Sequence, residues 1–278
     1  LRDTGLIMAI ATRDQLLAAL AGNHTRAIID KASLSNAVAA QLFSLWTATG
    51  VPSNGAAPTT AAVCTSALTG AVSFPNQTAP ASSYLGWATL ATGNANQGIE
   101  IHDRLAHMGG LSGTVTTAQG ALSLVTTNPG ADRIGDANYS DVQWFLEIYT
   151  ALGATGVNAT VNVTYNDDST GNLTAVALGA TPRAGRLYPL LSASVGRWIK
   201  AVNSVTLSAT TGTAGNFGIT ASRCRTVMAS DLASKPVIAT WAQLNLPEFY
   251  NDACIWLVMP CTTTTTGTVK QYAKIVHG

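Results

Sequence analysis

The sequence predicts a mainly β protein, in which an antiparallel β-sandwich or jelly roll follows a short helical N-terminal region and a long irregular arm. Apolar and polar residues alternate with a period of two over much of the chain after Asn138. Short turns that contain Gly and Asn separate these runs, and helical segments do not alternate with them. Many short strands with such turns are typical of a sandwich or jelly roll rather than of a parallel α/β sheet.

Residues 1–50 are predicted to be helical. Thr12 followed by Gln15 has the spacing of a capping box, which starts a helix. Gly22 and Asn23 can end this helix, because both residue types tolerate positive φ.

Two further helices are expected in the same region. The first is short and covers residues 27–31. In the second, apolar residues recur at positions i, i+4, i+7 and i+8 of one helical face, starting at Val38. The combined apolar face is large for a segment detached from the β region. We therefore expect it to contact a partner through Leu16, Leu20, Val38, Leu42, Leu45 and Trp46.

Residues 51–97 are predicted to form an irregular arm. The segment is rich in Pro, Gly, Ala, Thr and Asn, and it shows no sustained periodicity. An irregular stretch of this length is uncommon in a compact domain unless it has a function. We therefore expect the arm to pack on a neighbouring chain or on the β region.

Residues 98–278 are predicted to form the β-sandwich domain. The clearest strand covers residues 157–165, where Val, Ala and Tyr alternate with Asn and Thr. A turn at 166–171 leads to a returning strand at 173–178. Further strands are expected at 142–148, 202–209, 217–227, 252–259 and 268–276.

The composition is unusual in its low charge. Only 10% of the residues are charged, against about 25% in an average soluble domain. The surface must then be largely Thr, Ser, Asn and Ala, which suits extensive protein–protein contact. The net charge is +1 and the basic residues are scattered, which argues against a nucleic-acid partner. Apolar stretches are too short to span a membrane, and no signal peptide is evident. Met8 has the form of a natural start, so residues 1–7 are expected to be upstream sequence.

Motifs of catalysis and cofactor binding are missing from the sequence. It contains neither a phosphate-binding G-x-x-x-x-G-K-[ST] loop nor a G-x-S-x-G nucleophile elbow. His102 and His107 lie five residues apart, so neither a helix nor a regular strand makes them a metal pair. We expect no enzymatic activity, no cofactor and no metal site.

Acidic residues form no recognisable site either. Two carboxylates that face each other across a cleft would indicate a glycosidase, but sequence proximity does not identify such a pair. Asp103 and Arg104 are expected to form a structural ion pair or to cap a turn. A solvated turn, rather than a calcium loop, is the interpretation of Asp132, Asp136 and Asp141.

The four cysteines are interpreted as buried free thiols. Cys64, Cys224, Cys254 and Cys261 include no C-x-x-C pair, which argues against a zinc site. Cys254 and Cys261 flank a predicted strand and are the first pair to examine for a disulfide. The Trp residues are expected in the core, although exposed aromatic residues would indicate carbohydrate binding.

Several stretches between residues 45 and 278 are recognisable as a set. They are 50–58 (GVPSNGAAP), 83–87 (SYLGW), 101–107 (IHDRLAH), 142–149 (VQWFLEIY), 203–208 (NSVTLS), 246–248 (LPE) and 251–254 (NDAC). Together they resemble virion structural proteins of tailed bacteriophages, of the capsid-decoration or head-associated type. The resemblance implies a virion component without enzymatic activity, assembled in the cytoplasm of the host bacterium, and it carries over no site residues.

From these observations we expect a capsid decoration or cement protein. It would form a homo-oligomer and bind the major capsid protein or other virion proteins, because many weak contacts repeated by symmetry stabilise a shell. A tail, collar or fibre-associated virion protein would have the same composition. A receptor- or glycan-binding adhesin is the alternative from another class, and it would carry exposed Trp or Tyr in a groove near Asp residues.

Overall fold

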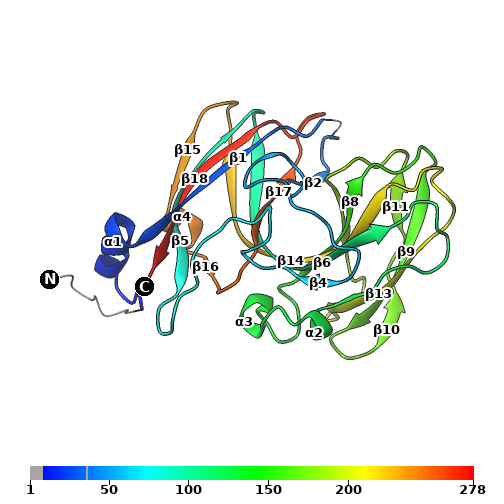
Figure 1. The fold of residues 1–278 in the computed structure, drawn as a ribbon, viewed down its shortest axis with the longest axis horizontal. Coiled ribbons are helices and arrows are strands. Elements are labelled where there is room, and N and C mark those ends of the chain that lie inside the picture. Colours follow the sequence, from blue (N-terminus) through cyan, green and yellow to red (C-terminus); the bar gives the residue numbers. More distant parts are fainter. Residues whose placement is uncertain (1–8, 36) are drawn as a thin grey trace.

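A closed barrel lies at the centre of the computed structural model, which describes residues 9–35 and 37–278 (Figure 1). The central sheet contains, in ladder order, β14 (Asn216–Ser230), β8 (Gln143–Thr150), β12 (Arg186–Leu190), β2 (Leu42–Ser44), β17 (Ile255–Pro260), β6 (Gln97–Leu111) and β4 (Ala62–Val63). Because β14 also pairs with β6, the described strands from β14 to β6 close into a ring. The expectation about the start at Met8 lies outside the described residues.

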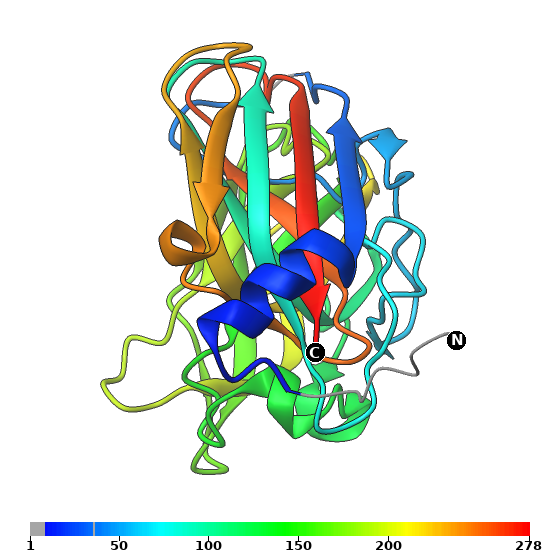
Figure 2. The same cartoon turned by 90° about the vertical axis from the view of Figure 1, so that its left-hand side faces the viewer.

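A second sheet, here called the β1/β18 sheet, packs against one side of the barrel (Figure 1). Its order is β15 (Val237–Thr240), β5 (Ser83–Thr92), β18 (Val269–His277), β1 (His24–Lys31) and β3 (Gly50–Val51), and β16 (Glu248–Phe249) also pairs with β5. Helix α1 (Arg13–Gly22) lies across the outer face of this sheet, where Leu16 and Ala19 pack against Val276 (Figure 2).

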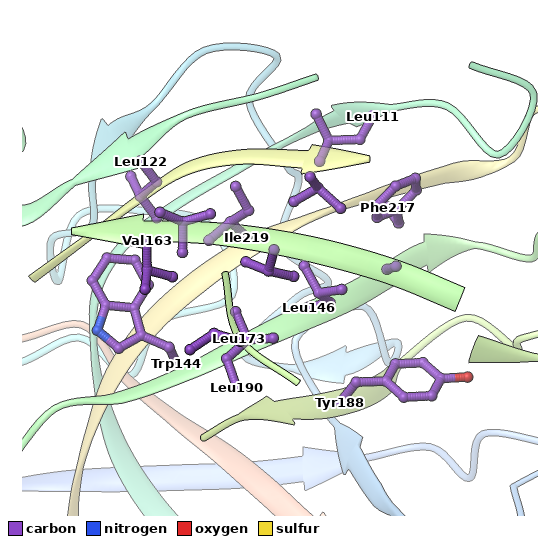
Figure 3. Close-up of a cluster of buried hydrophobic side chains, with 14 of the residues drawn as sticks. Leu111, Leu122, Trp144, Leu146, Val163, Leu173, Tyr188, Leu190, Phe217 and Ile219 are labelled. Carbon is purple, nitrogen blue, oxygen red and sulfur yellow. The ribbon is translucent and has the colours of Figure 1, made fainter. Parts of the chain in front are cut away.

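A third sheet, here called the β9/β13 sheet, packs against the opposite side of the barrel. Its order is β10 (Thr170–Asn172), β9 (Val157–Tyr165), β13 (Ile199–Leu207) and β7 (Leu122–Ser123), and β11 (Val176–Gly179) also pairs with β9. Figure 3 shows the apolar core between this sheet and the barrel, with Val163 and Leu122 near Trp144 and Ile219. The short helices are α2 (Leu124–Thr127), α3 (Ala131–Ile134) and α4 (Trp241–Leu244).

The predicted mainly β, antiparallel class is confirmed, and so are most strands of the C-terminal half. The returning strand predicted at 173–178 is instead divided into β10 and β11, with residues 173–175 outside both. Strand β9 alternates between buried and exposed residues along most of its length, as the sequence pattern predicts. The strands predicted at 202–209, 217–227, 252–259 and 268–276 correspond to β13, β14, β17 and β18. Strand β8 is also confirmed, but both of its faces are buried, because one faces the β9/β13 sheet and the other faces the barrel interior.

Two of the three predicted N-terminal helices are wrong. Residues 27–31 belong to strand β1, which pairs with β18 from His24 to Lys31. β-Branched Ile28 and Ile29 fit a pleated ladder better than an isolated helical turn. The segment from residue 38 to 46 is not helical either, since Leu42–Ser44 form β2 and the chain turns at Ala40 with φ 61. Only α1 is confirmed, with both hydrogen bonds of the Thr12–Gln15 capping box.

The arm predicted at 51–97 is partly regular. Strand β5 lies inside the β1/β18 sheet between β15 and β18, and the small residues Gly86 and Ala88 at its buried positions hide its periodicity. The irregular remainder packs over the barrel of the same chain, where Cys64 and Ala71 join its core. Strands from the three predicted regions, 1–50, 51–97 and 98–278, are thus combined in one sheet.

Candidate functional site: the polar interior of the barrel

An ion pair between Arg104 and Glu147 occupies the barrel interior. Both side chains are fully buried, and Arg104 Nη2 lies 2.5 Å from Glu147 Oε2. The guanidinium carbon is 4.6 Å from the ring centroids of both Trp46 and Trp256. Two aromatic faces at this distance stabilise a desolvated cation through cation–π attraction.

The carboxylate of Glu147 also accepts hydrogen bonds from two hydroxyl groups. The hydroxyls of Thr220 and Tyr149 donate to Glu147 Oε2 at 2.5 and 3.0 Å. Burial opposes ionisation, but the charge and hydrogen bonds of Arg104 outweigh it and lower the pKa of Glu147 below its ordinary value. Burial also raises the pKa of the Tyr149 phenol. The arrangement therefore holds a fixed charge pair that solvent does not reach, which is typical of a structural network.

Close packing of the irregular segment encloses this network. Trp46 Nε1 donates to the carbonyl of Ala56 at 3.0 Å. A Cβ on Gly55 would lie only 2.0 Å from the Trp46 ring, so only Gly fits here. The chain between β3 and β4 is thus fixed against the indole that covers Arg104.

A second ion pair joins Asp103 to Arg133. The guanidinium of Arg133, in α3, donates to both carboxylate oxygens at 2.6 and 2.9 Å, and to the carbonyl of Cys64 at 2.8 Å. The predicted ion pair between Asp103 and Arg104 is therefore wrong. Consecutive strand residues point to opposite faces, so each of the two takes a different partner.

His102 and His107 each have a partner inside the barrel. Arg104 Nε donates to His107 Nδ1 at 3.1 Å, and the rings of Trp46 and His107 pack edge to face with their centroids 5.7 Å apart. The ring centroids of His102 and Trp256 are 5.9 Å apart. A regular strand would point the two histidines to opposite faces. A register shift opposite Ala221 and Ser222 adds one extra residue to β6 between His102 and His107. Because of this extra residue, both histidine side chains point into the barrel.

His102 also takes part in a cluster at one end of the barrel. Its Nε2 lies 2.8 Å from Glu100 Oε2, and its Nδ1 lies 3.1 Å from Ser222 Oγ. Ligand atoms of Glu100, His102 and Cys224 lie within 4.8 Å of one another, and this is the group among the described residues that could hold a metal ion. The sequence prediction missed this cluster. The available signal was the i, i+2 spacing of Glu100 and His102, which places both side chains on one strand face.

All four cysteines are free thiols, as expected, but only Cys64, Cys254 and Cys261 are buried, and Cys224 is half-buried. Cys254 forms a side-chain hydrogen bond with Cys64 rather than with Cys261, the pair that the sequence singled out. Burial raises the pKa of Cys254, and burial raises that of Cys261 to about 11.

The acidic turn at 132–141 serves structural contacts. Asp136 accepts the backbone N–H of Asn138 at 3.0 Å, and Asp141 Oδ2 pairs with Arg223 at 2.8 Å. These contacts agree with the interpretation of the segment as a turn.

The six residues predicted to contact a partner do not share one face. Leu16 and Leu20 pack around Val276, whereas Leu45 and Trp46 are buried in the cores around the barrel. Leu42 is half-buried, and Val38 is 48% exposed. The single helical face on which the prediction was based is absent, because residues 38–46 are not helical. A role of these residues in partner contact stays a prediction.

A pocket of about 630 Å³ adjoins the barrel on the side of Glu100. Its lining includes Glu100, Phe145, Arg197 and Trp198, and the connection between β12 and β13 forms much of its wall. Trp198 is 40% exposed, contrary to the expectation that the Trp residues lie in the core. Arg197 Nε lies 3.1 Å from Asp167 Oδ2 beside it.

Comparisons with known proteins give no family. No family model matches the chain, and no curated protein matches it significantly. Weak structural similarity is found to infectious bursal disease virus, Gx strain, with 10% identity, a TM-score of 0.19, and coverage of 92% of this chain and 81% of that one. The VP2 subviral particle of the same virus gives 11% identity, a TM-score of 0.17, and coverage of 92% and 80%. Scores this low carry no functional argument. Within the described residues, every helix is too short or too polar to cross a membrane.

Proposed function

We propose that this chain is a structural protein of a tailed-phage virion, of the capsid decoration or cement type. The observation that carries the proposal is the solvent-facing side of the β1/β18 sheet. Ile28, Tyr272 and Ile238 on this face are 47%, 52% and 56% exposed. Exposed faces of antiparallel sheets normally carry polar residues, and exposed apolar patches mark interaction sites.

These side chains form a row across the sheet. Ile28 on β1 lies opposite Tyr272 on β18. The N–H of Tyr272 donates to Thr89 Oγ1 of β5 at 3.2 Å, and Thr89 lies opposite Ile238 of β15. The row therefore crosses the strands from β1 to β15, and half-buried Trp87 lies beside it on β5. A largely apolar row of this kind suits contact with another folded surface.

The low charge of the chain and its resemblance to virion proteins support the same proposal. In this proposal the chain forms homo-oligomers, contacts the major capsid protein or other virion proteins, and resides in the virion. It binds neither nucleic acid nor membrane, and it performs no catalysis. Two buried ion pairs, Arg104 with Glu147 and Arg133 with Asp103, support the last point, since substrate does not reach them.

The test is the copy number of the chain in purified particles, measured by quantitative mass spectrometry against the major shell protein. A decoration role predicts hundreds of copies in a simple ratio to the shell. A dozen copies or fewer would favour the tail, collar or fibre-associated alternative. Complete absence from particles would contradict a virion role.

The surface itself is tested by Tyr272→Asp. We expect this variant to fold normally but to lose oligomerisation or particle binding, measured by light scattering and co-sedimentation. Val125→Asp is the matched control, because Val125 is 57% exposed on α2, away from the row. Equal behaviour of the two variants would contradict the proposed surface.

A second candidate function, glycan binding, is favoured by one observation. Trp198 lines the 630 Å³ pocket beside Arg197 and Asp167, which matches the exposed aromatic residue near Asp expected of an adhesin. Titration with host polysaccharide would then quench Trp fluorescence in the native chain but not in Trp198→Ala. Identical responses of the two proteins would remove this candidate.

A further inference from the structure

We propose that Glu100, His102 and Cys224 bind a zinc ion at the end of the barrel that faces the 630 Å³ pocket. Their ligand atoms already lie within 4.8 Å of one another. His102 on β6 lies directly opposite Cys224 on β14, and Glu100 lies two residues before His102 on the same strand face. The backbone thus brings the three side chains together by strand pairing.

Ser222 orients the ring of His102. Its Oγ donates to the carbonyl of Asp103 at 3.0 Å and accepts from Trp256 Nε1 at 3.1 Å. The same oxygen lies 3.1 Å from His102 Nδ1, which leaves Nε2 directed toward Glu100.

In the structure, His102 Nε2 lies 2.8 Å from a carboxylate oxygen of Glu100, which is the distance of a hydrogen bond. A metal ion would replace this hydrogen bond, with small side-chain shifts that separate the two atoms to the spacing of two ligands on one ion. The thiol of Cys224 donates to the carbonyl of Thr226 at 3.8 Å and would turn to supply the third ligand.

The three ligand types select the metal. Thiolate and imidazole together favour zinc over magnesium or calcium, which prefer oxygen ligands. Three protein ligands leave a fourth tetrahedral position, and Glu100, which lines the pocket, is 27% exposed, so water can fill that position. Ser222 would orient the imidazole, as hydrogen-bond partners of metal-bound histidines usually do.

Binding balances charge and protons. Burial and then the charge of Glu100 raise the pKa of Cys224 to about 11, so the free thiol is protonated at neutral pH. Zinc binding forms the Zn–S bond and releases this proton to solvent. The resulting Zn²⁺, carboxylate and thiolate sum to zero charge, which suits a half-buried site.

The metal would link strands β6 and β14 in the barrel wall. The ladder between β6 and β14 shifts register directly after Cys224, where hydrogen bonding is locally interrupted. A zinc ion bound by residues of both strands would stabilise their pairing at this register shift. This inference is independent of the proposed virion role.

The experiment uses the full chain, stripped with a chelator and then titrated with Co²⁺ or Zn²⁺ alone. We expect one metal per chain by elemental analysis, and a thiolate-to-cobalt charge-transfer band. The band should disappear in Cys224→Ser and persist in Cys261→Ser, the matched cysteine control. Ser222→Ala should weaken binding by about 10- to 100-fold.

Glu100→Gln provides a second variant, because this partly exposed side chain can be changed with little risk to folding. It should lose affinity while circular dichroism stays unchanged. A folded native chain that binds no metal would overturn the proposal and leave the contact between His102 and Glu100 as a hydrogen bond. A band that survives in Cys224→Ser but disappears in Cys64→Ser would also overturn it, by placing the metal at Cys64 and Cys254.

Discussion

The interior of the barrel and the apolar layers outside it are made by the same strands but by different chemistry. On β8, Trp144, Leu146 and Ile148 face the β9/β13 sheet, whereas Glu147 and Tyr149 face the barrel interior. The outer layers are stabilised by apolar burial, which tolerates small adjustments. The interior is stabilised by a closed set of charges and hydrogen bonds, in which every group depends on its partner. The comparison predicts that adjacent residues of one strand respond to substitution in different ways.

Removal of one interior charge should have the largest effect. Glu147→Ala leaves Arg104 buried without its counter-ion, which costs about 3–5 kcal/mol in the free energy of unfolding. Urea denaturation monitored by fluorescence measures the loss. Asp30→Ala, which breaks the exposed pair with Lys270, is the control and should leave the midpoint unchanged. A double variant, Arg104→Met with Glu147→Leu, should recover most of the loss, because no unpaired charge remains.

Truncation of the neighbouring apolar residue should cause the second-largest loss in the free energy of unfolding. Leu146→Ala creates a cavity in the layer shown in Figure 3 and is expected to cost about 2–5 kcal/mol. Leu146→Met, which nearly conserves volume, should cost less than about 1.5 kcal/mol. The same urea titration distinguishes the two. If Leu146→Ala were as mild as Leu146→Met, the layer would be packed less closely than it is in the structure.

The pH dependence separates charge from packing. Because the pKa of Glu147 is lowered in the folded state, its contribution is present above its ordinary value of 4.5 and is lost as pH falls through the folded value. The stability difference between the native chain and Glu147→Gln should therefore be largest near neutral pH and should narrow below pH 4.5. The corresponding difference for Leu146→Ala should stay constant. Parallel pH profiles for both variants would contradict the charge assignment.

A smaller and local effect is expected at α1, which lies outside both regions. Thr12→Ala removes the hydroxyl that accepts the Gln15 N–H, and it should cost about 1 kcal/mol. Hydrogen exchange of the α1 amides should accelerate, while β8 and β14 stay protected. Thr12→Ser keeps the acceptor and should behave like the native chain. Faster exchange across the barrel would mean that α1 supports the whole fold.

The sequence predicts the layers that are built by simple alternation. Strand β9 shows this, because Ala159 and Val161 face a core while Asn158 and Thr160 face solvent. Prediction from the sequence fails where tertiary pairing overrides a local pattern. Ile28 and Ile29 favour a strand only weakly, and pairing with β18, more than 230 residues later, determines their conformation.

The site could be predicted less well than the fold. Asp103 and Arg104 are adjacent in sequence, so an ion pair between them is the simplest expectation. Because consecutive strand residues point to opposite faces, Asp103 pairs with Arg133 and Arg104 pairs with Glu147 instead. The cluster of Glu100, His102 and Cys224 depends on the pairing of β6 with β14 and on the bulges within it. One chain's spacing does not reveal such register shifts.

The position of β18 sets an order for folding during synthesis. The β9/β13 sheet is complete once residue 207 has left the ribosome, and the barrel is complete with β17 at residue 260. In the β1/β18 sheet, however, β5 and β1 are separated by the place that β18 takes. The edges of β5 and β1 that pair with β18 therefore stay without a hydrogen-bonding partner until residue 277 has been synthesised. Nascent chains at this stage would be the ones most prone to wrong edge pairing, and the ones on which a chaperone would act.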